Sequence, residues 1–416
     1  MALLSKLSSI CFTAVLAASL YPNMATPAVA SMDPSQVTVE QLYGQIAGPS
    51  VEENPNFVFS PLSIFTVFHA AQRGAAGETR RQMDALVGPN ESFDIPELEQ
   101  SNRAGGAVVA DVANRLYVHP GLEHNEHFVR FQRELEREKH SAEVIDFDDS
   151  AAAAKKINSF VADATRDHIK RLVDPSSLGP QTRLVLINAL YFKAPWLTQF
   201  QDHATSRDVF FAHSGPQKVF FMNGTLTKDP LLISMQKEVL ALGLPYADPR
   251  LRLYIFMPEN LQEFEQQIVK SPKVIEDLID NMESHAIAGL SEELHISMPR
   301  FKLSAEDNKI DLIELFASMG ATDMFDMDKA DFSGITGGRD LCVSSFVHQA
   351  DIDVNEEGTE ATAATAMAMM LRMMAMPKTP INVVLNKPFI FQLRFIDEGV
   401  NLNLFSGRIA DPSTAQ

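Results

Sequence analysis

Cysteine is nearly absent from this sequence. Only Cys11 and Cys342 occur among its 416 residues. Because Cys11 falls in the amino-terminal stretch that we interpret below as a cleaved leader, Cys342 has no partner left in the chain. Internal disulfide bonds are therefore excluded as a source of stability. With 45% hydrophobic residues, the chain is instead long and apolar enough to bury a core.

Basic residues are few compared with acidic ones. The chain has 35 Lys and Arg against 54 Asp and Glu, which gives a formal net charge of −19. A protein this acidic has no electrostatic reason to bind nucleic acid or an anionic membrane. A local basic cluster comprises Arg166, His168, Lys170 and Arg171. We interpret it as the solvated face of a helix in preference to a glycosaminoglycan site.

Motifs that would carry catalysis are missing as well. The sequence contains no Gly-x-Ser-x-Gly elbow, no His-Glu-x-x-His pair, no Gly-x4-Gly-Lys-Ser/Thr phosphate loop and no Cys-x-x-Cys. We therefore expect a protein that is not an enzyme and that uses neither a cofactor nor a metal.

Long apolar runs occur only at the amino terminus. Residues 1–30 combine a basic start at Lys6, an apolar stretch over 7–20 and the small residues 28–30. This pattern is typical of a secretory signal peptide, so we expect a secreted, extracellular protein. Loss of Lys6, the only charged residue of the leader, would change the net charge from −19 to −20. No later run is long enough to cross a membrane.

The remaining residues, 31–416, are predicted to form one domain, because no linker, repeat or low-complexity segment divides them. We expect it to be a monomer. Asn90-Glu91-Ser92 and Asn223-Gly224-Thr225 are sequons that predict N-glycosylation of Asn90 and Asn223.

Hydrophobic periodicity predicts helices in the first half and strands later. Helical spacing covers residues 35–48, 61–73, 78–87, 126–139 and 151–171. A nearly continuous apolar run over 182–192 suits a strand that is buried on both faces, and 251–257 is a further strand. Residues 389–395 and 400–406 flank turn residues and predict a hairpin. This order of elements favours an α+β fold.

The segment over residues 355–376 supports two readings. It is rich in Ala, Met, Leu and Glu, whose propensities predict a helix over 359–374. Every second residue is small or apolar, however, which also suits a strand with one buried face. The alternating set is Thr359, Ala361, Ala363, Thr365, Met367, Met369 and Leu371.

Family resemblance decides between these readings. Glu356-Glu357-Gly358-Thr359-Glu360-Ala361-Thr362-Ala363-Ala364-Thr365 resembles the hinge of the reactive-centre loop of serpins, the serine-protease-inhibitor family. Counting back from Arg372, Glu356 and Gly358 fall where the family has Glu and Gly. Further motifs over about residues 35–412 follow in family order: Phe59-Ser60-Pro61-Leu62-Ser63-Ile64, Asn188-Ala189-Leu190-Tyr191-Phe192-Lys193 with Trp196, Leu244-Pro245-Tyr246, Met298-Pro299-Arg300-Phe301, Val347-His348-Gln349-Ala350, Asn386-Lys387-Pro388-Phe389 and Phe405-Ser406-Gly407-Arg408.

The resemblance implies a fold of three β-sheets and about nine helices, with an exposed reactive-centre loop over about 356–380. It implies a scissile bond between Arg372 and Met373. It further implies a polar cluster where the strands of the main sheet part, formed by Ser60, Ser63, Asn188 and His348. Trp196, Arg300 and Glu356 match the region where the loop enters the sheet, and we predict an ion pair between Arg300 and Glu356.

The function that the resemblance implies is suicide inhibition, in which a covalent complex forms with the protease and the cleaved loop inserts into the main sheet. Arg372 indicates a trypsin-like serine protease as the partner, because a guanidinium suits a pocket floored by a carboxylate. Chymotrypsin- or elastase-like proteases acting beside Met370, Leu371 or Met373, cysteine proteases, and a non-inhibitory carrier or storage role remain alternatives.

Overall fold

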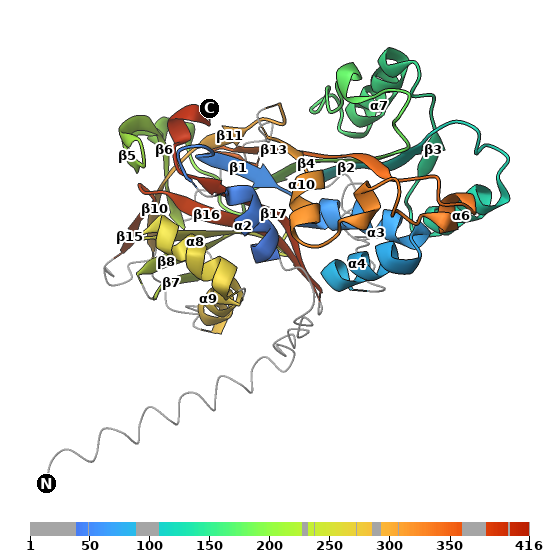
Figure 1. The fold of residues 1–416 in the computed structure, drawn as a ribbon. Coiled ribbons are helices and arrows are strands. Elements are labelled where there is room, and N and C mark those ends of the chain that lie inside the picture. Colours follow the sequence, from blue (N-terminus) through green and yellow to red (C-terminus); the bar gives the residue numbers. More distant parts are fainter. Residues whose placement is uncertain are drawn as a thin grey trace, which may run out of the picture.

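The computed structural model describes residues 39–48, 50–88, 108–226, 232–236, 238–271, 273–284, 293–306, 308–359, 380–397 and 400–415. These residues form three β-sheets and nine α-helices, so the predicted α+β architecture is confirmed. The predicted leader, residues 1–30, lies outside the described residues. Figure 1 shows the sheets in the interior and most helices at the periphery. Within the described ranges, no helix has both the length and the apolar character needed to span a lipid bilayer.

The helices gather early in the chain, as predicted. They are α2 (Val39–Ala47), α3 (Pro61–Gly74), α4 (Gly77–Val87), α6 (Glu126–Arg137), α7 (Ser150–Ala164), α8 (Leu261–Lys270), α9 (Val274–Ser284), α10 (Ile313–Ser318) and α11 (Ser333–Thr336). Local chemistry explains several of the starting points. At α3, the Ser60 hydroxyl accepts a hydrogen bond from the Ser63 amide and Pro61 occupies the first turn.

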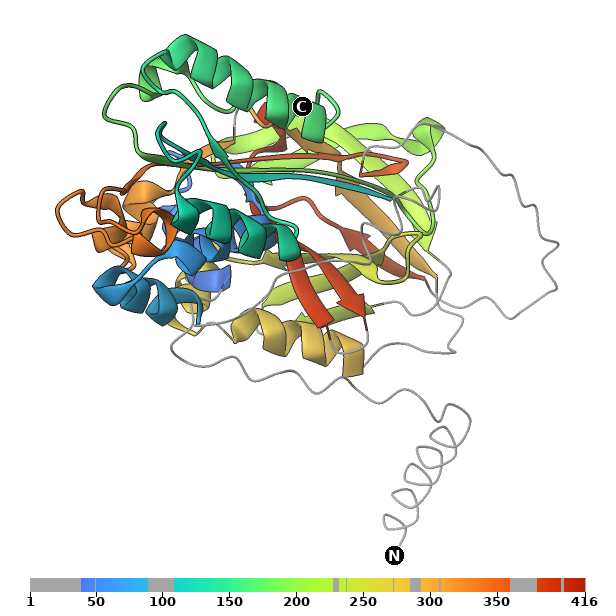
Figure 2. The same ribbon diagram turned by 90° about the vertical axis from the view of Figure 1, so that its right-hand side faces the viewer.

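The main sheet has seven strands. They are β11 (Phe301–Leu303), β13 (Val343–Val354), β14 (Gly358–Thr359), β4 (Leu184–Pro195), β2 (Val109–Val118) and β3 (Ala142–Val144), with β12 (Lys309–Asp311) paired to β13. β4 is buried along almost its whole length, as predicted for a strand covered on both faces. Its neighbour β2 contacts both α3 and α7, and Figure 2 shows these helices on opposite sides of the sheet.

Two further sheets complete the core. The six-stranded sheet runs β1 (Asn56–Phe59), β17 (Val400–Ile409), β16 (Phe389–Asp397), β9 (Leu251–Pro258), β8 (Val239–Pro245) and β7 (Leu232–Gln236). Its antiparallel β16–β17 pair confirms the predicted hairpin. The four-stranded sheet runs β15 (Ile381–Val384), β10 (Leu294–Pro299), β6 (Gly215–Leu226) and β5 (Ser206–Ala212).

The prediction that the basic cluster lies on a helix is wrong. α7 ends at Ala164, and not near residue 171, because the Thr165 hydroxyl accepts a hydrogen bond from the Ile169 amide and the next two residues adopt left-handed backbone angles. Arg166 instead pairs with Asp111 on β2 at 2.9 Å. The His168 ring stacks on Tyr191 of β4, with 3.6 Å between ring centroids. The cluster is thus divided between contacts to the main sheet and the exposed side chains of Lys170 and Arg171.

Candidate functional site

The main sheet is closed over most of its length and open at one end. β4 and β13 pair in parallel from Leu184 and Val343 to Tyr191 and Asp351. Beyond these residues the two strands separate and β14 lies between them. β14 is antiparallel to both neighbours, with Thr359 opposite Val354 of β13 and Ala194 of β4. The chain therefore enters the sheet as an extra strand at this end.

A tight turn over residues 355–357 places β14 in this gap. The Asn355 amide donates to the Gly358 carbonyl at 2.9 Å, and the Glu357 amide donates to the Asn355 side chain at 3.1 Å. Trp196 holds the turn twice, because its indole donates to the Asn355 carbonyl at 2.9 Å and its amide donates to the Glu357 carbonyl at 3.0 Å. Trp196 thus lies where the resemblance placed it, against the point of loop entry.

Gly358 is required here by close approach. A Cβ atom at this position would lie 2.1 Å from the Ala194 carbonyl oxygen and 2.6 Å from the Pro195 Cα. Both neighbours are backbone atoms of β4, so neither can move aside in the way that a flexible side chain can. Only glycine therefore lets the hinge lie in the sheet at this depth.

Thr359 follows with its side chain in the core. It is fully buried, and its hydroxyl lies 2.8 Å from that of Tyr246. Burial raises the pKa of Tyr246 well above its ordinary value, so its phenol stays protonated. The role of Tyr246 was not predicted from the sequence, although its Leu-Pro-Tyr motif was recognised.

Glu356 anchors the turn through its carboxylate. Its Oε1 accepts a hydrogen bond from the Thr205 hydroxyl at 2.6 Å and lies 4.0 Å from the Arg300 guanidinium. The predicted pairing with Arg300 is thus present, but at the outer limit of an ion pair. Thr205, which sequence reasoning missed, is the closer partner and lies in an irregular segment without a recognisable motif.

The predicted exposed loop over 356–380 needs correction at its start. Glu356, Gly358 and Thr359 are buried and Glu357 is half-buried, because β14 already occupies the sheet. The other predicted loop residues lie outside the described part of the chain: Glu360, Ala361, Thr362, Ala363, Ala364, Thr365, Arg372 and Met373. Their assignments therefore stay predictions.

A buried polar cluster lies beneath the closed part of the sheet. The Ser60 amide donates to His348 Nε2 at 3.0 Å, and His348 Nδ1 contacts the Asn188 side-chain oxygen. The Asn188 amide in turn donates to Ser63 and, at 2.6 Å, to Asn114. The structure thus brings the four predicted residues together. Asn114 on β2 was missed, and its only signal was a polar residue within a strand covered by helices.

The contacts of His348 define its protonation. Because Nε2 accepts a backbone N–H, the ring proton lies on Nδ1 and donates to Asn188. Burial lowers the pKa of His348 to about 3, so the ring is neutral at physiological pH. This neutral, fully bonded histidine joins β13, β4 and the start of α3, across the line along which β4 and β13 would part.

The remaining predicted residues lie apart from this site. Asn223 lies on β6, where its side-chain amide donates to the Ala204 carbonyl at 2.7 Å. A glycan on that nitrogen would have to break this bond, whereas Asn90 lies outside the described residues. Cys342 is buried, and burial raises the pKa of its thiol. Within the described ranges, no three His, Cys, Asp or Glu side chains come together as a metal site.

Fold and site define a protein whose main sheet accepts the first residues of a returning loop as a new strand. Comparison with known families agrees, since residues 38–412 match the model of the family described as "Serpin (serine protease inhibitor)". The chain belongs to the serpin family. Its family is one of protease inhibitors that bind serine proteases, which confirms that the chain is not an enzyme.

Curated relatives and solved structures cover most of the chain. Serpin B6 of Macaca fascicularis is 32% identical over 74% of this chain and 82% of its own. Leukocyte elastase inhibitor of Xenopus tropicalis is 30% identical over 86% and 93%. Among solved structures, native protease nexin-1 with heparin is 28% identical with a TM-score of 0.71, covering 90% of this chain and 96% of its own. Serpin48 of the insect Tenebrio molitor is 26% identical with a TM-score of 0.68, covering 89% and 95%.

Proposed function

We propose that this serpin is a secreted suicide-substrate inhibitor of trypsin-like serine proteases with its scissile bond between Arg372 and Met373. The protease serine attacks the Arg372 carbonyl carbon, the peptide bond breaks, and Met373 leaves with a protonated amine. The acylated chain then inserts further between β4 and β13. Strand addition of this kind, including serpin loop insertion, is an established mode of recognition and switching.

The observation that carries this proposal is the position of β14. Thr359 is buried against Tyr246 with the gap between β4 and β13 directly ahead of it. Because a strand repeats every two residues, continued insertion would place Ala361, Ala363 and Thr365 on the face of Thr359. The same face would then receive Met367, Met369 and Leu371. The predicted alternation thus continues the register of the observed strand without placing a charge on the buried face.

Energetic terms explain why that composition matters. Ordering a loop residue costs roughly 1–2 kcal/mol of backbone entropy, and a net hydrogen bond returns about 0.5–1.5 kcal/mol. These terms nearly cancel, so the apolar side chains decide the direction, at roughly 1.5–3 kcal/mol for each buried Met or Leu. Charged or bulky residues on this face would favour a non-inhibitory role, and the hinge contains none there.

Incubation with trypsin followed by a denaturing gel tests the mechanism. We expect a band at the summed mass of the two proteins, and mass spectrometry of the released fragment should show Met373 as its first residue. Cleavage without a covalent band would contradict suicide inhibition. A covalent band with a fragment beginning at Leu371 or Met374 would move the scissile bond and favour an elastase-like target, the activity named in the leukocyte elastase inhibitors to which this chain is similar.

Secretion rests on the leader over residues 1–30 and is tested separately. Expression of the full chain in a cell with a secretory pathway should release a protein that begins at Ser31, with an uncharged leader junction at Ala30. A product that keeps Met1 and stays within the cell would contradict this part of the proposal without affecting the inhibitory mechanism.

A further inference from the structure

The outer face of the β5–β6 hairpin has an unusual composition. Alternate residues of the two strands point outward in register, with Arg207 opposite Phe220, Val209 opposite Lys218 and Phe211 opposite Pro216. Arg300, just beyond β10, extends the first of these rows, since its amide donates to the Phe220 carbonyl at 3.1 Å. We call this surface the Arg–Phe face; it comprises Arg207, Val209, Phe211, Lys218, Phe220 and Arg300.

Two guanidinium groups are held over one ring on this face. The Arg207 and Arg300 guanidinium carbons lie 4.7 and 4.5 Å from the centroid of Phe220. Cation–π contact of this kind orients side chains that would otherwise sample many rotamers. Both arginines nevertheless stay accessible, and the Arg300 side chain is 45% exposed. A partner would therefore meet pre-positioned charges, which lowers the entropy cost of binding.

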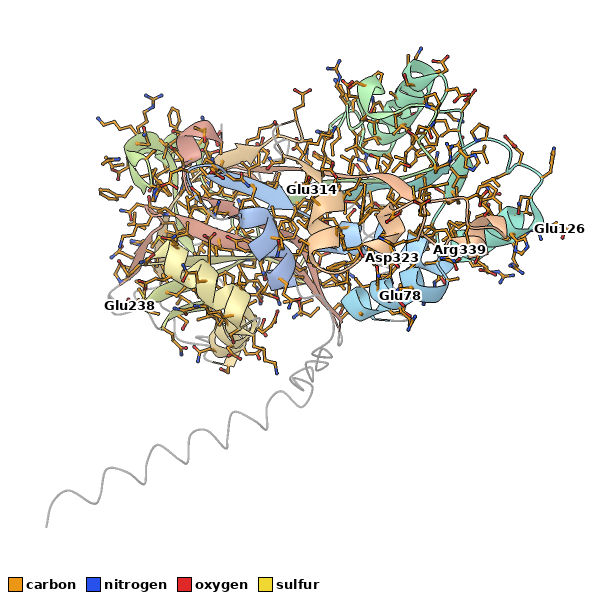
Figure 3. All side chains as sticks on the ribbon, viewed as in Figure 1. Glu78, Glu126, Glu238, Glu314, Asp323 and Arg339 are labelled. Atoms are coloured by element: carbon orange, nitrogen blue, oxygen red, sulfur yellow. The ribbon has the colours of Figure 1, made fainter. Side chains whose placement is uncertain are left out.

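Charge distribution makes the face distinctive in so acidic a protein. Its outward positions carry three cations and no carboxylate. The nearby Asp208 accepts from the Val209 amide at 2.7 Å, and Glu356 lies mostly buried behind Arg300. Acidic side chains elsewhere project from widely separated elements, as Figure 3 shows for Glu78, Glu126, Glu238 and Glu314. The Arg–Phe face is thus a cationic area on a molecule that otherwise repels anions.

Apolar area accompanies these charges. Phe211 is 51% exposed, and Val209 and Phe220 are partly exposed. Protein-binding surfaces are enriched in arginine and aromatic residues, which also supply most of the residues that dominate binding energy. The composition therefore fits a protein partner with an acidic surface better than it fits a free anion.

The location of the face indicates which protein this partner is. The chain leaves the described structure at Thr359, beside Glu356 and Arg300, and returns at residue 380, one residue before β15. β15 and β5 are the two edges of one four-stranded sheet, so about 15 Å separates them at the usual strand spacing. A protease that engages the intervening residues is held next to this sheet at both attachments.

We propose that the Arg–Phe face is an exosite that binds an acidic surface of the target protease before the reactive bond is cleaved. This inference rests on the proposed function. Electrostatic complementarity at such a site raises the association rate more than it changes the chemistry that follows. The exosite would therefore select acidic proteases from among those able to cleave after Arg372.

The test compares two double variants that each change the net charge by −4. Arg207→Glu with Lys218→Glu reverses the Arg–Phe face and leaves Arg300, which borders the hinge, unchanged. Arg133→Glu with Lys155→Glu is the matched control on α6 and α7, which lie at the other end of the molecule from β5 and β6 (Figure 1). Association rate constants are measured against trypsin-like proteases of acidic and of basic surface charge, at low and high salt.

We expect the exosite variant to associate about tenfold more slowly with the acidic proteases at low salt, with the difference shrinking at high salt and absent for the basic proteases. Its covalent complex and melting temperature should match the wild type. Equal effects of the two double variants, or no effect of the first, would overturn the exosite while leaving the proposed function intact. If the wild type formed no covalent complex with any protease, the proposed function itself would be refuted.

Discussion

The hydroxyl groups of Tyr246 and Thr359 lie 2.8 Å apart in a fully buried position, one on the turn after β8 and the other at the leading end of the hinge strand. Because neither group reaches water, each depends on the other for a hydrogen-bond partner. This bond is therefore a local measure of how firmly the hinge is held in the sheet.

Replacement of Tyr246 by Phe should loosen the hinge strand. Thr359 would keep a buried hydroxyl without its partner, at a cost of about 1–3 kcal/mol. We expect faster hydrogen exchange at the amides of Gly358 and Thr359, with exchange in the β16–β17 hairpin unchanged. Tyr254→Phe is the matched control, because it removes an equally buried hydroxyl that donates to Glu283 at 2.7 Å in a different sheet. Equal protection of β14 in the two variants would contradict the prediction.

Substitution of Gly358 by Ala should impair inhibition without preventing cleavage. The added methyl group would meet the backbone of β4, so the hinge could not lie in the sheet as it does here. Insertion would then compete poorly with hydrolysis of the acyl-enzyme, and we expect the number of inhibitor molecules consumed per protease inactivated to rise severalfold. Gly179→Ala, which meets no atom within 4 Å, should leave that number unchanged; a rise in both variants would indicate a general glycine effect instead.

His348 should make stability fall as the pH is lowered. Burial depresses its pKa from 6.5 to about 3 in the folded state, so the unfolded chain binds more protons between these values. Stability is therefore complete above pH 6.5 and declines toward pH 3, by about 2 kcal/mol between pH 6.5 and 5. Urea unfolding of the wild type and His348→Asn across this range measures the difference. His69, whose pKa is lowered to about 4, contributes equally to both proteins, so parallel pH profiles would refute the assignment to His348.

Glu40 should have the opposite effect. This residue of α2 is buried, one carboxylate oxygen has no hydrogen-bond partner, and burial raises its pKa to about 7 despite the nearby Arg394. Arg394 is itself held by Glu276 at 2.6 Å. The folded protein binds the extra proton, so stability rises as the pH falls from 7 toward 4.5. We expect Glu40→Gln to be more stable than the wild type by about 2–3 kcal/mol at pH 8 and to lose that advantage near pH 4.5, as followed by urea unfolding.

Sequence patterns predicted the parts of the fold that depend on local composition. The run over 182–192 became β4 because its residues are apolar on both faces, and the hairpin near the carboxyl terminus followed from its turn residues. The end of α7 could not be predicted in this way, because Arg166 and Asp167 adopt left-handed angles that neither residue signals. Their conformation depends on the side chain of Thr165 and on contacts with β2 and β4.

At the site, family motifs brought together residues whose contacts no periodicity could reveal. Ser60, Asn188 and His348 are distant in sequence and meet only through the pairing of β4 with β13. Thr205 and Asn114 were missed because a single polar side chain gives no signal until its neighbours are known. The inserted position of Gly358 and Thr359 was missed for a different reason, since it depends on whether an edge exists between two other strands.

The parallel pairing of β4 with β13 determines what each further step of insertion must do. Advancing the loop by one residue separates one existing strand contact and creates two, one on either side of the newcomer. The net return thus accumulates with depth, while the separation at the tip comes first every time. Movement from Thr359 is consequently uphill at its front and downhill behind, so the process resembles crack propagation, in which a split advances only while the material closing behind it releases enough energy.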